Sequence, residues 1–159
     1  MKQEWIKRLL TVCLVLLLAA TMGMAQDAKT LYREGKALYD QKDYAAALPK
    51  LRAAAEKGHK KAQYRLGRCY QKGHAVAKDR EVAFQWYQKS ARQDYAKAQL
   101  ALAKCYLKGK GTAADEKKAK TWLSRAVKNE KDGEAILTEL KEEAAAGDED
   151  AVALLRLLK

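Results

Sequence analysis

Few side chains in this 159-residue sequence have the types and spacing needed for covalent chemistry. Its two serines, Ser90 and Ser124, begin no Ser-x-x-Lys motif and occupy no Gly-x-Ser-x-Gly turn, so neither has the surroundings that activate a serine nucleophile. The two histidines, His59 and His74, each follow a glycine, and a polar residue at such a turn needs no catalytic role. We therefore predict that the protein is not an enzyme.

Neither the carboxylates nor the cysteines indicate a bound cofactor. The carboxylates at 142–143 and 148–150 cluster near the C-terminus, where a solvated face is a simpler explanation than an acid/base pair. The three cysteines are scattered among the two histidines without the spacing of a zinc site. We expect no catalytic residue, no metal and no other cofactor.

Composition indicates one helical domain with an acidic or anionic partner. One proline and 9 glycines accompany abundant Ala, Leu, Lys and Glu, a mixture that favours helices over strands. The formal net charge is +12, which favours acidic partners or anionic surfaces. Acidic side chains concentrate in residues 133–159, which therefore look like a distinct cap.

The first 25 residues have the pattern of a signal peptide. Three basic residues precede an uncharged run from Leu9 to Ala25, whose centre is strongly apolar. Small residues at Gly23 and Ala25 predict cleavage after Ala25 and a periplasmic or secreted protein. The alternative is an uncleaved N-terminal membrane anchor, since the run just reaches the length of a spanning helix. After cleavage no membrane span is expected, and export argues against a nucleic-acid partner.

Two segments repeat at a spacing of 36 residues. Residues 61–73 align with residues 97–109, and the register continues through later pairs: Asp79 and Asp115, Ala83 and Ala119, Trp86 and Trp122. Within the first copy, Ala62, Leu66 and Tyr70 have helical spacing, Gly73 can end that helix, and Asp79 can cap the next. Each copy is therefore a predicted helix pair. Because one pair buries too little apolar area alone, the pairs must stack, which makes Trp86, Trp122, Tyr70 and Tyr106 core residues.

These residues resemble the Sel-one-like repeat family, whose pattern has Ala, Leu-Gly, Tyr, a glycine-rich turn, Asp, Ala and Trp-Tyr. The resemblance covers residues 58–128, with Ala75 in place of a turn glycine and Thr112 in place of a turn valine. It implies an all-α fold, a right-handed alpha-alpha superhelix of stacked helix pairs. The expected repeats are 60–96 and 97–131.

Shorter units flank the two repeats within the predicted domain of residues 26–159. Residues 28–59 are similar to a tetratricopeptide repeat, and residues 133–159 look like a truncated capping unit. Gly147, Ala151 and Leu155 of that unit have the spacing of Gly58, Ala62 and Leu66. Its leucines should cover the end of the stack, with its acidic side chains in water.

Cys69 and Cys105 occupy equivalent positions and are predicted to be buried free thiols. Neighbouring helix pairs pack about 8–10 Å apart. A disulfide bridges alpha carbons no more than about 7 Å apart.

A ladder of basic residues runs along the predicted first helices. Each rung has two basic residues seven positions apart, on one helix face, with a third residue between them. We predict that this ladder lines a partner-binding groove: Lys29, Tyr32 and Lys36; Lys61, Tyr64 and Arg68; Lys97, Leu100 and Lys104. Three other lysines, Lys89, Lys117 and Lys128, are expected on the outer surface.

Two functions fit this pattern. The first is a protein-interaction scaffold of the cell envelope that binds an extended acidic peptide or a chain terminus, with Arg68 making a bidentate contact to a carboxylate. The alternative is an envelope protein that holds anionic cell-wall or lipid polymers by diffuse charge. Diffuse electrostatic binding should collapse at high ionic strength, whereas a groove with aromatic contacts should keep affinity.

Overall fold

The computed structural model describes residues 26–159, so the predicted signal peptide lies outside the described residues. Within 26–159 the chain forms eight α-helices and no strand, which confirms the predicted all-α fold. The helices are α2 (Ala28–Asp40), α3 (Tyr44–Glu56), α4 (Lys60–Lys72), α5 (Arg80–Ala91), α6 (Ala96–Lys108), α7 (Glu116–Val127), α8 (Gly133–Ala145) and α9 (Glu149–Leu157).

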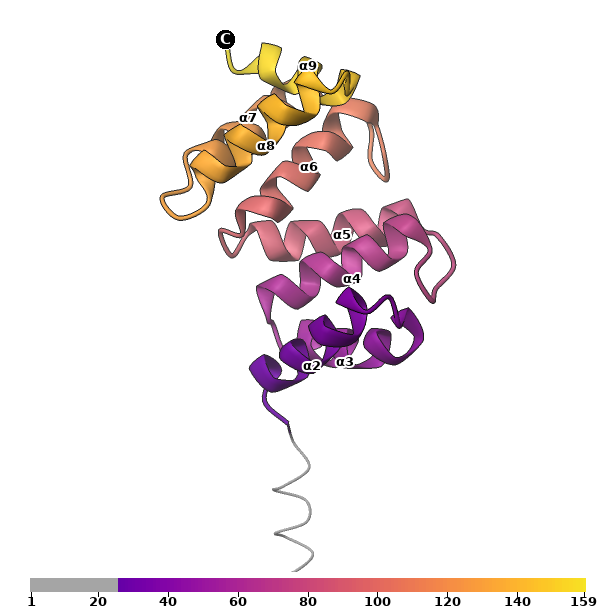
Figure 1. Ribbon diagram of the computed structural model, residues 1–159. Coiled ribbons are helices and arrows are strands. Elements are labelled where there is room, and N and C mark those ends of the chain that lie inside the picture. Colours follow the sequence, from indigo (N-terminus) through magenta and orange to yellow (C-terminus); the bar gives the residue numbers. More distant parts are fainter. Residues whose placement is uncertain (1–25) are drawn as a thin grey trace, which may run out of the picture.

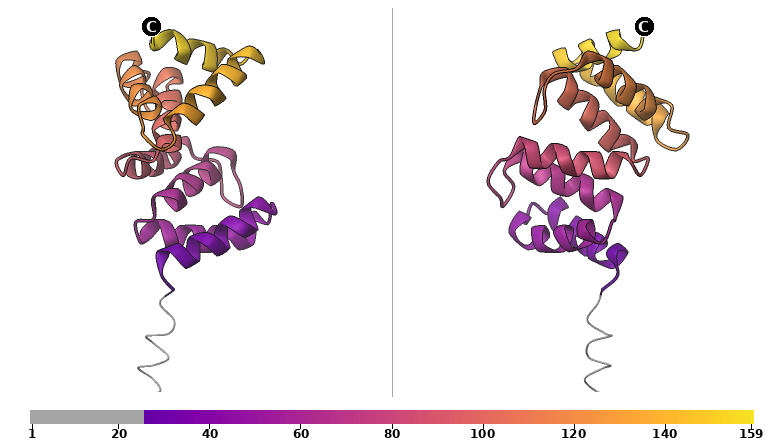
Figure 2. Two further views of the ribbon diagram at one scale, coloured as in Figure 1. Left: turned by 60° about the vertical axis from the view of Figure 1, so that its left-hand side comes forward. Right: turned by 180° about the vertical axis from the view of Figure 1, so that it is seen from behind.

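The helices pair in sequence order, and the pairs stack into an α-solenoid. Figure 1 shows α2 and α3 at one end, α4 with α5 and α6 with α7 in the middle, and α8 with α9 at the C-terminal end. The turned views in Figure 2 show the same order of layers. None of the helices in the described part of the chain is long and apolar enough to cross a membrane.

Capping residues set the ends of the repeat helices where the sequence predicts them. The carboxylate of Asp79 accepts hydrogen bonds from backbone N–H groups in the first turn of α5, and Asp115 does the same for α7. Gly73 and Gly109 end α4 and α6 in the left-handed conformation, with φ of 78° and 62°. The two repeats therefore share their helix boundaries as well as their sequence.

The turn between the paired helices contains Ala75 where the family pattern has a glycine. Gly111 has φ of 77°, and a Cβ atom there would lie 2.0 Å from the carbonyl oxygen of Arg80. Ala75, at the equivalent position of the preceding repeat, adopts the same left-handed region with φ of 58°. The alanine therefore carries backbone strain that the glycine avoids, while the turn keeps its shape.

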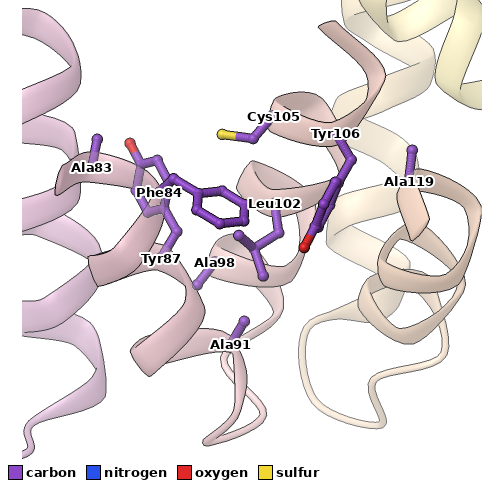
Figure 3. Packing of buried hydrophobic residues seen from close by; sticks show 9 residues of the cluster. All are labelled: Ala83, Phe84, Tyr87, Ala91, Ala98, Leu102, Cys105, Tyr106 and Ala119. Atoms are coloured by element: carbon purple, nitrogen blue, oxygen red, sulfur yellow. The ribbon is translucent and has the colours of Figure 1, made fainter. Parts of the chain in front are cut away.

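Apolar side chains at the repeat spacing fill the space between pairs. Ala62 and Leu66 on α4 are fully buried, as are their equivalents Ala98 and Leu102 on α6. In Figure 3, Leu102 and Phe84 meet at the α5–α6 interface, and Phe84 packs edge-on against Tyr106 with ring centroids 5.3 Å apart. Tyr106 is buried, and the other three predicted core aromatics pack half-buried against core clusters: Tyr70, Trp86 and Trp122.

Cys69 and Cys105 are buried free thiols, as predicted. Cys69 packs with Tyr39 and Leu51, whereas Cys105 belongs to the cluster around Phe84. Burial raises the pKa of each thiol to about 11.

The C-terminal pair covers the end of the stack but does not leave all its acidic side chains in water. Leu154 is fully buried, and Leu155, Leu157 and Leu158 pack around it. Glu143 forms an ion pair with Lys104 at 2.8 Å, and Asp150 pairs with Lys108 on the same helix α6. The expectation that these two carboxylates face only water was wrong, because α8 and α9 pack against the lysine-bearing end of α6.

Candidate functional site: a basic hollow

A concave hollow with a volume of about 1180 Å³ lies among α2, α4, α6, α7 and the turn at 128–132. We call it the basic hollow and define it by its lining residues. Ten of them are basic: Lys36, Lys60, Lys61, Arg65, Lys97, Lys117, Lys120, Arg125, Lys128 and Lys131. The others are Tyr32, Asp94, Tyr95, Gln99, Thr121, Ser124, Asn129, Glu130 and Asp132. Three acidic side chains among ten basic ones leave the surface strongly positive.

The hollow brings together four residues of the predicted ladder. Tyr32 and Lys36 come from α2, Lys61 from α4 and Lys97 from α6. They belong to three successive helix pairs, which stacking places along one surface. Lys29, also on α2, is exposed but does not line the hollow.

The last two residues of the ladder lie in a different environment. Leu100 is only 6% exposed and packs in a core cluster with Leu123 and Leu140. Lys104 forms its ion pair with Glu143 of α8. The C-terminal pair covers this part of α6, so the ladder is interrupted at its third rung.

Tyr64 and Arg68 form the interior side of α4. The Tyr64 ring lies between Tyr87 and Tyr95, with centroid distances of 5.7 and 5.4 Å, and burial raises the pKa of its hydroxyl. Burial alone would lower the pKa of Arg68, but the phenol oxygens of Tyr64 and Tyr39 raise it overall. Arg68 is therefore a half-buried, permanently charged group among tyrosines.

Helix α7 contributes to the hollow, which the sequence pattern did not indicate. Lys117, Thr121 and Ser124 follow one face of this second helix, Lys128 caps its C-terminal end, and all four line the surface. Lys117 and Lys128 were expected on the exterior, and that expectation was wrong. Residues of α7 line the hollow together with residues of α4 and α6, and a single repeat period does not specify how successive pairs are placed.

Arg65 and Tyr32 form an ordered wall of the hollow. Arg65 lies 3.2 Å from the carboxylate of Asp40 and stacks over the Tyr39 ring at 5.1 Å. Burial lowers the pKa of Arg65, but its hydrogen bond to Tyr32 and the charge of Asp40 raise it overall. Tyr32 stacks on His59 with ring centroids 4.3 Å apart. Both side chains are therefore held in place before any partner binds.

Both histidines have structural roles. His59 Nδ1 accepts a hydrogen bond from the N–H of Ala62 at 3.3 Å and so caps α4. His74 stacks on Tyr44 at 3.9 Å, and its Nδ1 lies 3.3 Å from the hydroxyl of Tyr39. Burial lowers the pKa of each imidazole, and nearby cations lower it further.

Gln63 and Gln99 are buried polar residues to which the sequence analysis assigned no role. Gln63 donates to the carbonyl of Ala55 at 3.1 Å, and Gln99 donates to the carbonyl of Ala91 at 3.4 Å. Each of these carbonyls also accepts a backbone N–H, so the glutamine is a second donor at the end of the preceding helix. The signal in the sequence was that both repeats have glutamine at this position.

In the described residues, no group of three His, Cys, Asp or Glu side chains is placed to hold a metal ion. The hollow instead offers cations, two tyrosine rings, hydroxyls and amides. These groups can bind an anionic, hydrogen-bonding ligand by contact.

Comparison with known proteins agrees with this architecture. The Sel1 repeat matches residues 60–95 and 96–130, which span α4 with α5 and α6 with α7. No curated protein matched the chain.

Three solved structures are similar to the chain. A Sel1 repeat protein from Oxalobacter formigenes has 30% identity and a TM-score of 0.62, over 79% of this chain and 54% of its own. A protective antigen present in uropathogenic Escherichia coli strains, displaying an SLR fold, has 27% identity and a TM-score of 0.64, over 81% and 29%. Cysteine-rich protein B of Helicobacter pylori has 27% identity and a TM-score of 0.53, over 57% and 69%.

The chain thus spans about half the length of the first of these structures and less than a third of the second. Sel1 repeats are generally non-catalytic scaffolds that mediate protein–protein interaction. The chain therefore contains two Sel1 repeats, and Sel1 repeat proteins are among its structural neighbours.

Proposed function

We propose that this protein is a non-enzymatic scaffold of the cell envelope that binds an extended acidic peptide or an acidic chain terminus in the basic hollow. The observation that carries the proposal is the concentration of ten basic side chains around one concave surface. Tyr32 and Tyr95 supply apolar area within the same surface.

Most of these cations form no ion pair with the described residues. Among residues 26–159, Lys36 and Arg65 are the members of the hollow that form ion pairs, and both pair with Asp40. The other eight basic side chains make no ion pair with the described residues. Like charges held together in a concave surface raise its positive potential, which an acidic partner lowers on binding.

The ladder residues contribute unequally to this proposal. We assign contacts with the partner to Tyr32, Lys36, Lys61 and Lys97, which line the hollow. Lys104 and Leu100 do not line the hollow, because the C-terminal pair covers them, so both lie outside the proposed contact surface. Three residues of the ladder do not line the hollow and are assigned no contact with the partner: Lys29 on α2, and Tyr64 and Arg68 on α4.

The proposed location rests on the N-terminal sequence. The basic start, the apolar run and the small residues before Gln26 are typical of a cleaved signal peptide. We therefore place the repeat domain in the periplasm or outside the cell, where an acidic segment of another envelope protein is the proposed partner. Retention of residues 1–25 as a membrane anchor would leave the hollow on the same side of the membrane.

Charge-matched variants test the hollow directly. Lys61, Lys97 and Lys128 line it, whereas Lys57, Lys78 and Lys141 are exposed elsewhere and form no ion pair with the described residues. The probe is a fluorescent octaglutamate peptide, and its Kd is measured by anisotropy at two salt concentrations. Replacing the first three by Ala should weaken binding at least tenfold, since each lost contact to a charged group is worth about 1 kcal/mol.

The control triple variant loses the same total charge, so it should weaken binding less than about threefold. Equal losses in both triple variants, together with steep salt dependence in both, would show binding by diffuse charge. That result would favour anionic cell-wall or lipid polymers as partners and would refute the groove.

A further inference from the structure

An unused hydrogen-bond acceptor in the basic hollow indicates which class of acidic partner it takes. We infer that the side-chain oxygen of Gln99 accepts a hydrogen bond from a backbone N–H of the bound partner. The occupant is then an acidic polypeptide in extended form, not a polymer whose charged backbone offers only oxygens. This inference rests on the proposed function, since it concerns the same surface.

The oxygen of Gln99 is buried without a partner. Gln99 is 1% exposed and lines the hollow. Its Nε2 donates to the carbonyl of Ala91 at 3.4 Å and to Asp94 Oδ1 at 3.3 Å. Among the described residues, its Oε1 is the buried side-chain atom that accepts no hydrogen bond. Buried acceptors in folded proteins nearly always have a hydrogen-bond partner, so an unpaired one beneath the lining of the hollow indicates room for one more donor.

The preceding repeat shows how the same position is normally satisfied. There, Gln63 Oε1 accepts from Gln93 Nε2 at 2.8 Å. The residue equivalent to Gln93 is Asn129, whose side chain is one methylene shorter and whose Nδ2 donates to the carbonyl of Asp94 instead. The second repeat has thus lost the internal donor while keeping the glutamine. The lost donor is on the side that faces the hollow, since Asn129 also lines it.

An extended acidic peptide supplies both kinds of group that the surface lacks. Its carboxylates can pair with lysines of the hollow, and its main chain presents N–H groups that an extended conformation leaves unpaired. Polyphosphate of the same charge can satisfy the lysines but has no N–H to donate. The open acceptor at Gln99 therefore favours the peptide.

The test compares two ligands and two glutamine variants. The ligands are N-acetylated octaglutamate amide and polyphosphate of matched charge, titrated against the same protein. Gln99→Met keeps the length of the side chain and removes the acceptor together with the two hydrogen bonds that Nε2 donates, and the polyphosphate arm controls for that second loss. Gln63→Met is the control, because Gln63 does not line the hollow. Far-UV circular dichroism confirms that each variant is folded.

Gln99→Met should weaken octaglutamate binding about fivefold to tenfold, the value of one net hydrogen bond, and leave polyphosphate binding within about twofold. Gln63→Met should change neither affinity. A second arm uses the unaltered protein with octaglutamate N-methylated along its backbone. The unaltered protein should bind the N-methylated peptide as weakly as the Gln99→Met variant binds octaglutamate. The Gln99→Met variant should bind both peptides with equal affinity.

Unchanged octaglutamate affinity in Gln99→Met would overturn the inference, because the peptide would then make no hydrogen bond to the oxygen. An equal loss for polyphosphate would also overturn it, since the effect would then come from the shape of the hollow. In both cases the lysine variants can still support the proposed function. Failure of octaglutamate to bind the unaltered protein at all would refute both.

Discussion

Individual side chains hold the turns of this solenoid, and His59 is one whose pKa is lowered by burial. Its Nδ1 must be unprotonated to accept from Ala62, and its ring stacks on Tyr32 in the wall of the basic hollow. The folded state lowers its pKa below 6.5, so unfolded chains bind more protons under mild acid. The stability that His59 contributes is therefore present above pH 6.5 and is lost as the pH falls through the folded pKa.

We predict that lowering the pH from 7.5 to 5 reduces the free energy of unfolding more in the unaltered protein than in His59→Asn. Asparagine caps a helix without titrating, and a cap is worth about 1 kcal/mol. Urea unfolding at several pH values measures the difference. His74, whose pKa is also lowered, supplies the pH dependence that remains in the variant. Parallel pH profiles for the two proteins would contradict this role of His59.

Within each repeat, one residue on each of the paired helices meets the other, and both residues change between the two repeats. A Cβ atom at Gly67 of α4 would lie 2.6 Å from the Tyr87 ring on α5. In the next repeat the equivalent residues are Ala103 and Leu123, both fully buried. The larger residue on one helix thus accompanies the smaller one on the other.

We predict that Gly67→Ala lowers the free energy of unfolding by about 1–3 kcal/mol, the usual cost of overpacking a core. Adding Tyr87→Leu should restore part of the loss, because it copies the pair found in the next repeat. Gln71, which accepts from the Tyr87 hydroxyl at 2.9 Å, is partly exposed and can bind water instead. Chemical denaturation of both variants gives the values. A double variant less stable than Gly67→Ala alone would refute the pairing.

The sequence was sufficient to predict the helix pairs but only part of the site. Helix periodicity and capping are local rules, so the sequence alone predicts these helices. The signals were the spacing of Ala62, Leu66 and Tyr70 and the end residues Gly73 and Asp79. Membership of the hollow depends on how each pair is placed relative to the next, which the repeat pattern does not specify. The hollow includes Lys117 of α7 and its C-cap Lys128, and packing of the C-terminal pair removed Leu100 and Lys104.

At the scale of the whole molecule, the C-terminal pair determines where the stack ends. Its buried side chains Ile136, Leu140 and Leu154 cover Leu100 and Leu123 of the second repeat. Its carboxylates Glu143 and Asp150 bind lysines of α6. The pair thus combines an apolar contact with partial neutralisation of the basic surface beside the hollow.

We predict that deleting residues 134–159 exposes the apolar end of α6 and α7 and causes aggregation, because capping units keep solenoids soluble. Size-exclusion chromatography with light scattering measures the outcome. The double substitution Glu143→Gln with Asp150→Asn is the control. It removes the ion pairs, each worth at most about 1 kcal/mol at a partly exposed site, and should remain monodisperse. A soluble truncation as stable as the full domain would refute the capping role.

The central claim is that an acidic peptide binds in the basic hollow and not over the positive surface generally. Nuclear magnetic resonance tests it most directly, by following backbone and side-chain amide shifts of the labelled protein during titration with octaglutamate. Binding in the hollow should shift the signals of Lys97, Ser124 and Lys128 and of the side-chain amide of Gln99, which line the hollow. Shifts of equal size at Lys57 and Lys78, which are exposed outside it, would contradict the account.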